Sequence, residues 1–148
     1  MRKQFSKKDC RDFLQHHPEA NELMTKKSNV VQDDDALYIE NTLSFILMSG
    51  EWIPSVRVLI EHPSLLPRIV VDKGAIRFVV NGADIMRPGI IFADQFKADS
   101  LVVVVDETVG KPIAVGKALF SSEKLMEMDS GKVVATLHHI DDKYWAMG

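Results

Sequence analysis

The sequence predicts an α+β protein in which a small N-terminal module of helix and sheet precedes a β barrel or sandwich. Helical patterns are confined mainly to residues 6–26 and 54–63, and short apolar runs between turn residues fill most of the remainder. Four of these runs follow one another at short spacing in the second half, which is typical of a small closed sheet. We therefore expect two modules, residues 1–65 and residues 66–148.

The first predicted element is a helix over residues 6–26. Ser6 is suited to the N-cap position, and Asp9 three residues later completes a pattern like a capping box. Pro18 is expected to break or restart this helix, because proline lacks the amide hydrogen that a helix interior needs.

A small antiparallel sheet is predicted next. Residues 30–48 contain three apolar or aromatic runs separated by polar turns, and Ser49-Gly50 is predicted to end the sheet. Pro54 then begins a second helix, which Pro63 closes.

The second half of the chain is predicted to be rich in strands. Turn residues such as Gly110 and Gly131 separate the runs, and Tyr144-Trp145 is predicted as a last short strand. The four main runs are Ile90–Phe92, Leu101–Val105, Pro112–Leu119 and Lys132–Ile140.

One stretch, residues 69–82, fits two different structures. It can form a hairpin that turns at Asp72-Lys73-Gly74, which residue propensity favours. It can also form a helix with Asp72 as N-cap and Gly82 just past its C-terminus. On the helical alternative, Val79 and its apolar neighbours pack inward.

Composition and charge limit the possible functions. The 148 residues are 46% hydrophobic and 26% charged, which is enough to bury a core, and the longest apolar run is far shorter than a bilayer crossing of roughly 20 residues. The single cysteine, Cys10, excludes an internal disulfide, and no secretory signal is visible. We expect a cytoplasmic protein that does not enter a membrane.

The net charge of −3 is unusual for a general nucleic-acid-binding protein, but positive charge is concentrated locally. Residues 1–11 carry an excess of four positive charges and residues 68–87 an excess of two. The acidic residues gather elsewhere, at 33–35, 106–107 and 141–142. A protein of this composition should bind RNA through one restricted patch.

No catalytic or metal-binding motif is apparent. Asp33-Asp34-Asp35 is typical of a turn, and His138 and His139 would point to opposite sides of a strand. Cys10 has neither the partners of a zinc site nor a visible general base, and no glycine-rich phosphate loop is present. The sequence therefore predicts no enzyme, no catalytic residue, no metal and no cofactor.

A resemblance to a known family adds to these patterns. Residues 71–89 read VDKGAIRFVVNGADIMRPG and resemble the opening of a PUA domain, named for pseudouridine synthases and archaeosine transglycosylases. Two later stretches fit the same domain in order, GKPIAVGKALFSSEKL at 110–125 and LHHIDDKYWAM at 137–147. Residues 26–67, which end in VRVLIEHPSLLP, resemble the N-terminal module of the malignant T-cell-amplified sequence family and its archaeal relatives.

The resemblance implies a PUA-type β pseudobarrel for residues 66–148, a helix at residues 72–82, and RNA binding around residues 72–90. In that family it also implies a role at the small ribosomal subunit and tRNA. Basic side chains one helical turn apart could hold successive phosphates, and aromatic residues near the C-terminus could stack on a base. The predicted RNA-binding residues are Lys73, Gly74, Arg77, Asn81, Gly82, Ala83, Arg87, Gly89, Lys143 and Trp145.

Two functions remain open at this point. The first is a non-catalytic RNA-binding protein that docks structured RNA, a tRNA end or ribosomal RNA, in translation or RNA modification. The second is an adaptor for a translation factor or the small ribosomal subunit, with RNA contact secondary. The basic patch at residues 68–87 favours the first, and the net negative charge slightly favours the second.

Overall fold

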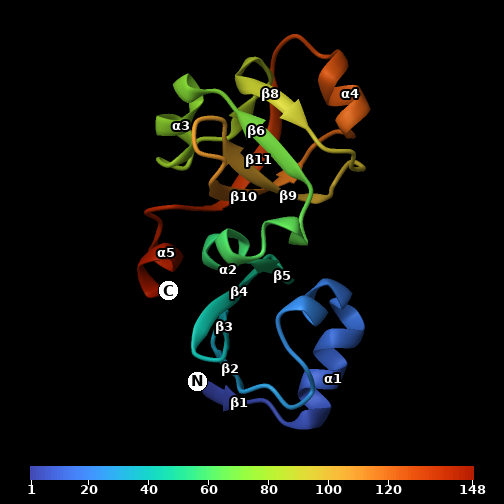
Figure 1. Cartoon of the computed structure of the whole chain (residues 1–148), viewed down its shortest axis with the longest axis vertical. Helices are drawn as coiled ribbons and strands as arrows, with labels where there is room; N and C mark the ends of the chain where they lie inside the picture. The colour runs from blue at the N-terminus through green and yellow to red at the C-terminus, as the bar shows by residue number, and fades with distance from the viewer. The chain divides into compact units, whose positions relative to one another are not determined.

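The structure is a computed structural model that describes all 148 residues. Its chain divides into two compact units, residues 1–54 together with Gly148, and residues 55–147. Each unit has a hydrophobic core of its own, and Figure 1 draws the helices and strands of both. The domain boundary at residue 65 stays a prediction. None of the helices combines the length and apolar composition that crossing a bilayer requires.

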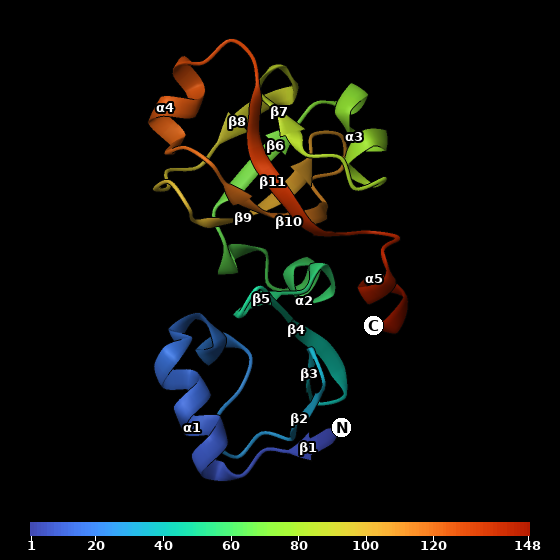
Figure 2. The same cartoon turned by 180° about the vertical axis from the view of Figure 1, so that it is seen from behind.

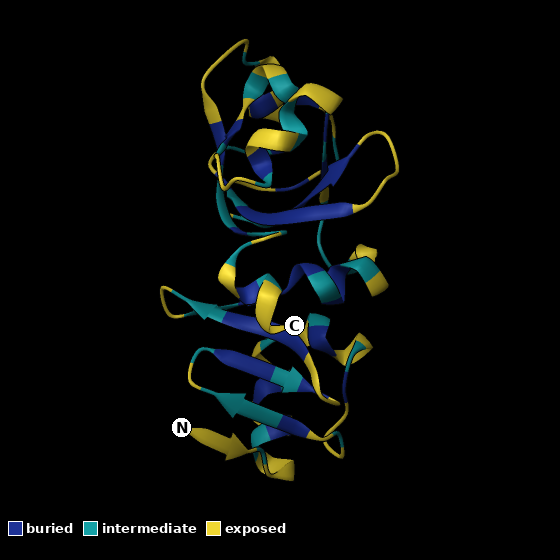
Figure 3. Cartoon of the chain, turned by 90° about the vertical axis from the view of Figure 1, so that its left-hand side faces the viewer, coloured by how far each residue is buried: buried dark blue, intermediate teal, exposed yellow.

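The N-terminal unit is a five-stranded antiparallel sheet whose strand order follows the chain. Its strands are β1 (Arg2–Gln4), β2 (Val30–Asp33), β3 (Ala36–Ile39), β4 (Thr42–Met48) and β5 (Glu51–Pro54). Figure 2 shows helix α1 beside this sheet, where its buried Cys10 and Phe13 pack with the strands. Edge strand β1 is exposed along its whole length (Figure 3).

Helix α1 (Lys7–His16) begins where the sequence predicted. The Ser6 hydroxyl accepts a hydrogen bond from the Asp9 amide at 3.0 Å, and the Asp9 carboxylate accepts one from the Ser6 amide at 3.0 Å. The predicted continuation to residue 26 is wrong, because the chain after Pro18 forms only a 3-10 helix, η1 (Pro18–Glu22).

The prediction that Ser49-Gly50 ends the sheet is wrong. Both residues have positive φ, 50° and 78°, which is the geometry of a tight hairpin turn, and the chain continues into β5. Helix α2 (Val56–Glu61) follows with Ser55 as N-cap, and Pro63 begins the 3-10 helix η2 (Pro63–Leu65) that closes it.

The C-terminal unit is a curled six-stranded sheet in the order β7-β11-β10-β9-β6-β8. Its strands are β6 (Arg68–Val71), β7 (Ile85–Met86), β8 (Ile90–Ala93), β9 (Leu101–Asp106), β10 (Pro112–Ala118) and β11 (Lys132–His139). Neighbouring strands are antiparallel except for β6 and β9, which are parallel. The two edge strands, β7 and β8, are joined by the short 3-10 helix η3 (Arg87–Gly89), so the sheet nearly closes on itself. The predicted α+β fold with a pseudobarrel, and its four main strands, are confirmed.

Gly116 shows how tightly this sheet is packed. A Cβ atom there would lie 2.5 Å from Val134 Cγ1 and 2.8 Å from the Ala135 carbonyl oxygen. The register also shifts between Val115 and Gly116, where the strand bulges. A residue without a side chain is therefore needed where β10 approaches β11.

Residues 72–82 contain helix α3 (Lys73–Val79), so the helical alternative is confirmed and the hairpin is wrong. The Asp72 carboxylate accepts a hydrogen bond from the Ala75 amide at 3.0 Å, and Val79 is buried in the core. The hairpin fails because the preceding strand β6 pairs with β8 and β9 instead.

The predicted strand at Tyr144-Trp145 is wrong, because these residues lie in helix α5 (Lys143–Met147). The Asp142 carboxylate accepts a hydrogen bond from the Trp145 amide at 2.8 Å, and this N-cap overrides the strand propensity of the two aromatic residues. Helix α4 (Ser122–Glu127) follows Ser121, whose hydroxyl accepts a hydrogen bond from the Lys124 amide at 3.2 Å.

Candidate nucleic-acid interface

A pocket of about 640 Å³ lies beside α3, between this helix and the segment from residue 83 to residue 89. We call it the α3 pocket. Its wall is mainly apolar, with charged groups at only three positions. It is lined by Asp72, Gly74, Ala75, Phe78, Val79, Ala83, Asp84, Ile85, Met86, Pro88, Gly89 and Lys132.

Small residues keep the α3 pocket open. Gly74, Ala75, Ala83 and Gly89 all line it, and none has a side chain beyond Cβ. A Cβ at Gly89 would lie 3.2 Å from Ala75 Cβ, and the Gly89 carbonyl accepts a hydrogen bond from the Asp72 amide at 2.9 Å. The backbone at residue 89 is therefore held directly against the start of α3, and a ligand can approach the main chain closely.

The pocket has an exposed aromatic and thioether wall. Phe78 is 54% exposed and Met86 is 50% exposed, although both are large apolar side chains. The guanidinium carbon of Arg77 lies 4.8 Å from the centre of the Phe78 ring. A flat, open ring beside a cation is the arrangement on which an unpaired base can stack while its phosphate is neutralised.

An ion pair forms a polar part of the wall. Lys132 Nζ lies 3.0 Å from an Asp84 carboxylate oxygen, and the Thr136 amide donates to the same carboxylate at 2.9 Å. The hydrogen bond from Thr136, reinforced by Lys132, holds the pKa of Asp84 below its usual value. Asp84 is therefore ionised at neutral pH and fixes the Lys132 ammonium at the pocket.

Eight of the ten predicted RNA-binding residues lie on α3 or in the segment that follows it. Lys73, Arg77 and Asn81 are exposed, and Gly74, Ala83 and Gly89 line the pocket directly. Gly82 has φ +89° and lies just past the C-terminus of α3, whose C-cap is Val80.

Arg87 is less accessible than the sequence indicated. Its Nη1 donates to the Ile90 carbonyl at 3.2 Å, and its Nε is buried without a hydrogen-bond partner. The guanidinium is thus turned toward the η3 turn, and only part of it faces solvent.

The last two predicted residues, Lys143 and Trp145, lie on α5 and do not line the α3 pocket. The Arg57 guanidinium carbon is 4.0 Å from the centre of the Trp145 ring, and Arg57 Nη2 donates to the Trp145 carbonyl at 2.9 Å. Tyr144 is buried edge-on against His138. Neither aromatic residue of α5 therefore presents an open ring comparable to that of Phe78.

A buried histidine and aspartate anchor α5. His138 Nδ1 lies 2.7 Å from an Asp142 oxygen, and His138 Nε2 is buried without a partner. Burial lowers the pKa of His138 although Asp142 opposes the shift. For Asp142, burial acts to raise the pKa, but the hydrogen bonds from the amides of His139 and Trp145 have the larger combined effect. The pKa of Asp142 is therefore held below its usual value. The histidine is neutral and the aspartate ionised at neutral pH. No three histidine, cysteine or acidic side chains of the chain are grouped as metal ligands.

Nine of the twelve residues that line the pocket were not among the predicted RNA-binding residues, and Phe78, Met86 and Lys132 are three of the nine. Phe78 lies one helical turn after Gly74, so its position beside the pocket follows once the helix is assumed. Met86 lies in the same segment as the predicted residues Ala83 and Arg87, so its position near the pocket could also be inferred. Lys132 reaches the pocket only because β11 pairs with β7, where Lys132 stands opposite Met86. No local pattern in the sequence predicts that pairing.

The fold and the pocket define the class of the protein. Residues 67–140 match the PUA domain family, so this is a PUA-domain protein. Translation machinery-associated protein 20 of Eremothecium gossypii is 34% identical over 137 residues, covering 84% of this chain and 76% of the relative. Malignant T-cell-amplified sequence 2 of Homo sapiens is 32% identical over 140 residues, covering 88% and 77%. The chain belongs to this family of translation machinery-associated and malignant T-cell-amplified sequence proteins, as the resemblance predicted.

Solved structures agree with this assignment. A hypothetical protein from Pyrococcus horikoshii superposes with a TM-score of 0.85 at 32% identity and covers 99% of both chains. A chain of an H/ACA ribonucleoprotein bound to a substrate RNA superposes with a TM-score of 0.51 at 26% identity, covering 65% of this chain and 29% of that one.

Proposed function

We propose that this protein is a cytoplasmic, non-catalytic RNA-binding protein of the translation machinery, and that its α3 pocket receives an unpaired end or loop of a structured RNA. A tRNA end and ribosomal RNA are the candidate ligands. The observation that carries this proposal is the exposed Phe78 ring, which has Arg77 beside it and lines a pocket together with Lys132 in a PUA domain.

The pocket fits an unpaired nucleotide chemically. Its volume of about 640 Å³ lies within the usual range for small-ligand sites, about 300–1,000 Å³. A base can stack on Phe78, while Lys73 and Arg77, one helical turn apart and both exposed, can contact successive phosphates. Sequence-specific RNA recognition generally uses such unstacked bases, since the grooves of an RNA duplex display little sequence information.

The titratable groups of the pocket support a binding role without catalysis. Asp72 caps α3 by accepting from the Ala75 amide, and Asp84 and Lys132 are paired with each other. Covalent catalysis needs a nucleophile within hydrogen-bonding distance of a free general base. These pocket residues include no such pair. The relatives support the cellular role, because one of them is named for its association with the translation machinery. The ribonucleoprotein neighbour, solved with RNA, supports RNA as the ligand.

A second candidate function is an adaptor for a translation factor or the small ribosomal subunit. Strand β8 is an edge of the sheet, and its Ile91 and Phe92 are 48% and 45% exposed. An extended segment of a partner protein can pair with such an edge and cover its apolar side chains.

Two exposed phenylalanines allow a matched test of the two functions. We expect crosslinking in cell extract, followed by sequencing, to recover a structured RNA that binds the purified protein. Phe78→Ala should weaken that binding by about 1–3 kcal/mol, the usual contribution of a stacked base. Phe92→Ala should leave it unchanged, although Arg68 lies 5.3 Å from its ring much as Arg77 lies beside Phe78. Loss of binding with Phe92→Ala alone would favour the edge strand, and failure to recover any RNA would remove the proposed function.

A further inference from the structure

The N-terminal unit carries five exposed cationic side chains that form no ion pair. Three belong to α1 and two to the turn that precedes β2. None of them lies within ion-pair distance of a carboxylate, although the same unit contains nine acidic residues. We call this set the α1 basic surface. It consists of Lys7, Lys8, Arg11, Lys26 and Lys27.

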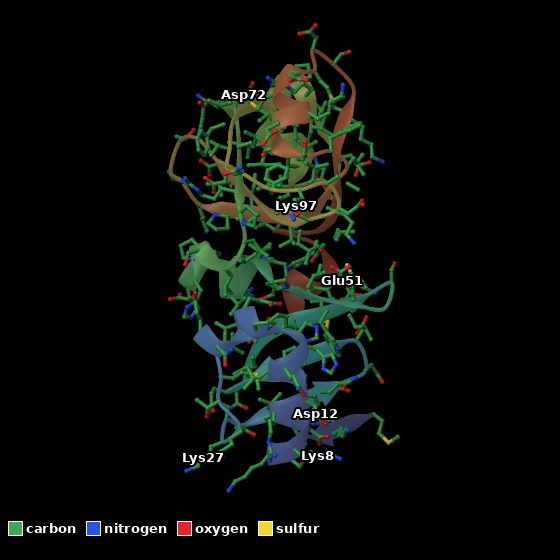
Figure 4. The ribbon with its side chains drawn as sticks, turned by 90° about the vertical axis from the view of Figure 1, so that its right-hand side faces the viewer. Lys8, Asp12, Lys27, Glu51, Asp72 and Lys97 are labelled. Carbon is green, nitrogen blue, oxygen red and sulfur yellow. The ribbon has the colours of Figure 1, made fainter.

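The fold brings these two segments together. Cys10 Sγ lies 3.9 Å from the Ser28 carbonyl oxygen, and the Phe5 amide donates to the Val30 carbonyl at 2.8 Å, so residues 25–28 run beside the first turns of α1. Lys7 and Arg11 are one helical turn apart on the side of α1 next to Cys10. Figure 4 shows Lys8 and Lys27 extending from the same end of the unit.

The turn that carries Lys26 and Lys27 is held in one conformation by local hydrogen bonds. The Thr25 amide donates to the Ser28 hydroxyl at 2.9 Å, and the Lys27 amide donates to the Thr25 hydroxyl at 3.1 Å. The backbone of the turn is therefore fixed while the two ammonium groups remain in solvent.

The other cationic side chains of the N-terminal unit, Arg2 and Lys3, are already paired. Arg2 pairs with Asp33 at 3.6 Å, and Lys3 pairs with Asp9 at 3.7 Å. Asp12, one turn after Lys8, lines a separate small hollow together with Asp9 and His16. The segregation leaves the α1 basic surface as the concentration of unpaired positive charge in a unit that is acidic as a whole.

We propose that the α1 basic surface binds the phosphate backbone of RNA and gives the protein a second contact, chemically distinct from the α3 pocket. This inference rests on the proposed function, because it assumes that RNA is the ligand. Flexible ammonium and guanidinium groups contact phosphates without regard to base sequence. Any preference for particular bases would then come from the α3 pocket alone.

The chemistry of the surface favours phosphates over an apolar partner or a bilayer. Met1, which precedes β1, is the one large apolar residue of the N-terminal unit that is exposed. The basic surface thus has no apolar or aromatic anchor of the kind that membrane-surface helices and protein hot spots use. What remains is an electrostatic contact, whose strength must fall steeply with salt.

The test compares two triple variants that remove the same charge. Lys7→Ala, Lys8→Ala and Arg11→Ala change the basic surface. Lys97→Ala, Lys111→Ala and Lys124→Ala remove three exposed and unpaired lysines from the C-terminal unit, where Figure 4 labels Lys97. Binding of a labelled oligouridine of about 20 nucleotides is measured between 50 and 200 mM salt.

The first variant should lower the slope of log affinity against log salt by about 2, since each lost single-strand phosphate contact removes roughly 0.7. Over a fourfold change in salt, the wild type should therefore lose about 20-fold more affinity than this variant. The control variant should keep the wild-type slope. Circular dichroism checks that both variants remain folded.

Other outcomes separate the two proposals. If the first variant keeps the wild-type slope while Phe78→Ala loses binding, the inference fails and the proposed function stands. If both triple variants lose slope equally, the charge acts without a defined surface and the inference fails. Polyglutamate of equal charge is tested as a competitor of the RNA. If it displaces the RNA from the wild type and the control but not from the first variant, the ligand of the basic surface is an acidic polypeptide instead. A wild-type protein that binds no RNA overturns the proposed function itself.

Discussion

Helices α3 and α5 of the C-terminal unit begin in the same way, but their aromatic residues differ in exposure. Each starts at an aspartate whose carboxylate accepts an amide hydrogen bond three residues on, at 3.0 Å for Asp72 and 2.8 Å for Asp142. Each also carries an aromatic residue beside a basic one. Phe78 on α3 is 54% exposed, however, whereas Tyr144 on α5 is 8% exposed.

The difference arises from what lies against each helix. Trp145, the other aromatic residue of α5, is covered by the Arg57 guanidinium and held through its carbonyl oxygen by the same side chain. Phe78 also has a guanidinium beside it, that of Arg77, but the other residues around it in the α3 pocket include several small ones, and its ring stays largely exposed. An aromatic residue in the sequence therefore indicates a stacking surface only where its neighbours leave a ring face uncovered.

The largest effect that we expect is a loss of folding stability when the cap of α5 is removed. Asp142→Ala removes the cap of α5, the partner of the His139 amide and the only hydrogen-bond partner of the buried His138 ring. We expect the free energy of unfolding to fall by about 3 kcal/mol, because a buried polar group is left unpaired and a cap is lost. Urea unfolding followed by circular dichroism measures the change.

Asp72→Ala is the matched control, since it removes one cap from α3 and leaves no buried group without a partner. It should cost about 1 kcal/mol. Equal losses from the two substitutions would contradict the assignment of α5 as the structural helix and α3 as the binding helix.

A second effect depends on pH. Burial lowers the pKa of His138 below its ordinary 6.5, so the unfolded chain takes up this proton more readily than the folded protein. The free energy of unfolding should therefore fall as pH drops below 6.5, by up to about 1.4 kcal/mol per pH unit, until the folded protein is protonated too. A further loss of stability should begin below pH 3.8, because Asp142 is protonated in the unfolded chain before it is protonated in the folded protein.

Urea unfolding at a series of pH values, compared between wild type and His138→Gln, isolates the histidine. The substitution should flatten the profile just below pH 6.5 and leave the loss at lower pH, which depends on carboxylates. A profile that is unchanged by the substitution would show that His138 is not protected from protonation.

Features that depend on residues close together in the sequence could be predicted. The starts of α1 and α4 follow from Ser6 and Ser121, because an N-cap hydrogen bond joins residues only three apart. The main barrel strands follow from apolar runs and turn residues. For α3, local propensity favoured a hairpin, and the resemblance to the PUA family was needed to choose the helix.

Features that depend on distant residues could not be predicted. The parallel pairing of β6 with β9 aligns Arg68 with Val103, and the pairing of β11 with β7 brings Lys132 to the α3 pocket. Nor could the sequence show that Arg57 covers Trp145, because 88 residues separate them. The predicted site therefore combined residues of the open pocket with residues of a packed helix.

The smallest effects that we expect are on RNA affinity, when single phosphate contacts are removed. Lys73→Ala and Arg77→Ala should each weaken RNA binding by about 0.5–1.5 kcal/mol, and each should lower the salt slope by roughly 0.7. Arg87→Ala should weaken binding by a similar amount, but it also breaks the hydrogen bond to Ile90 and must be accompanied by a thermal melt. Lys143 on α5 is the control, equally exposed and basic but outside the pocket lining. If Lys143→Ala weakens binding as much as Lys73→Ala and Arg77→Ala do, the RNA also contacts α5, and the division of roles between the two helices is wrong.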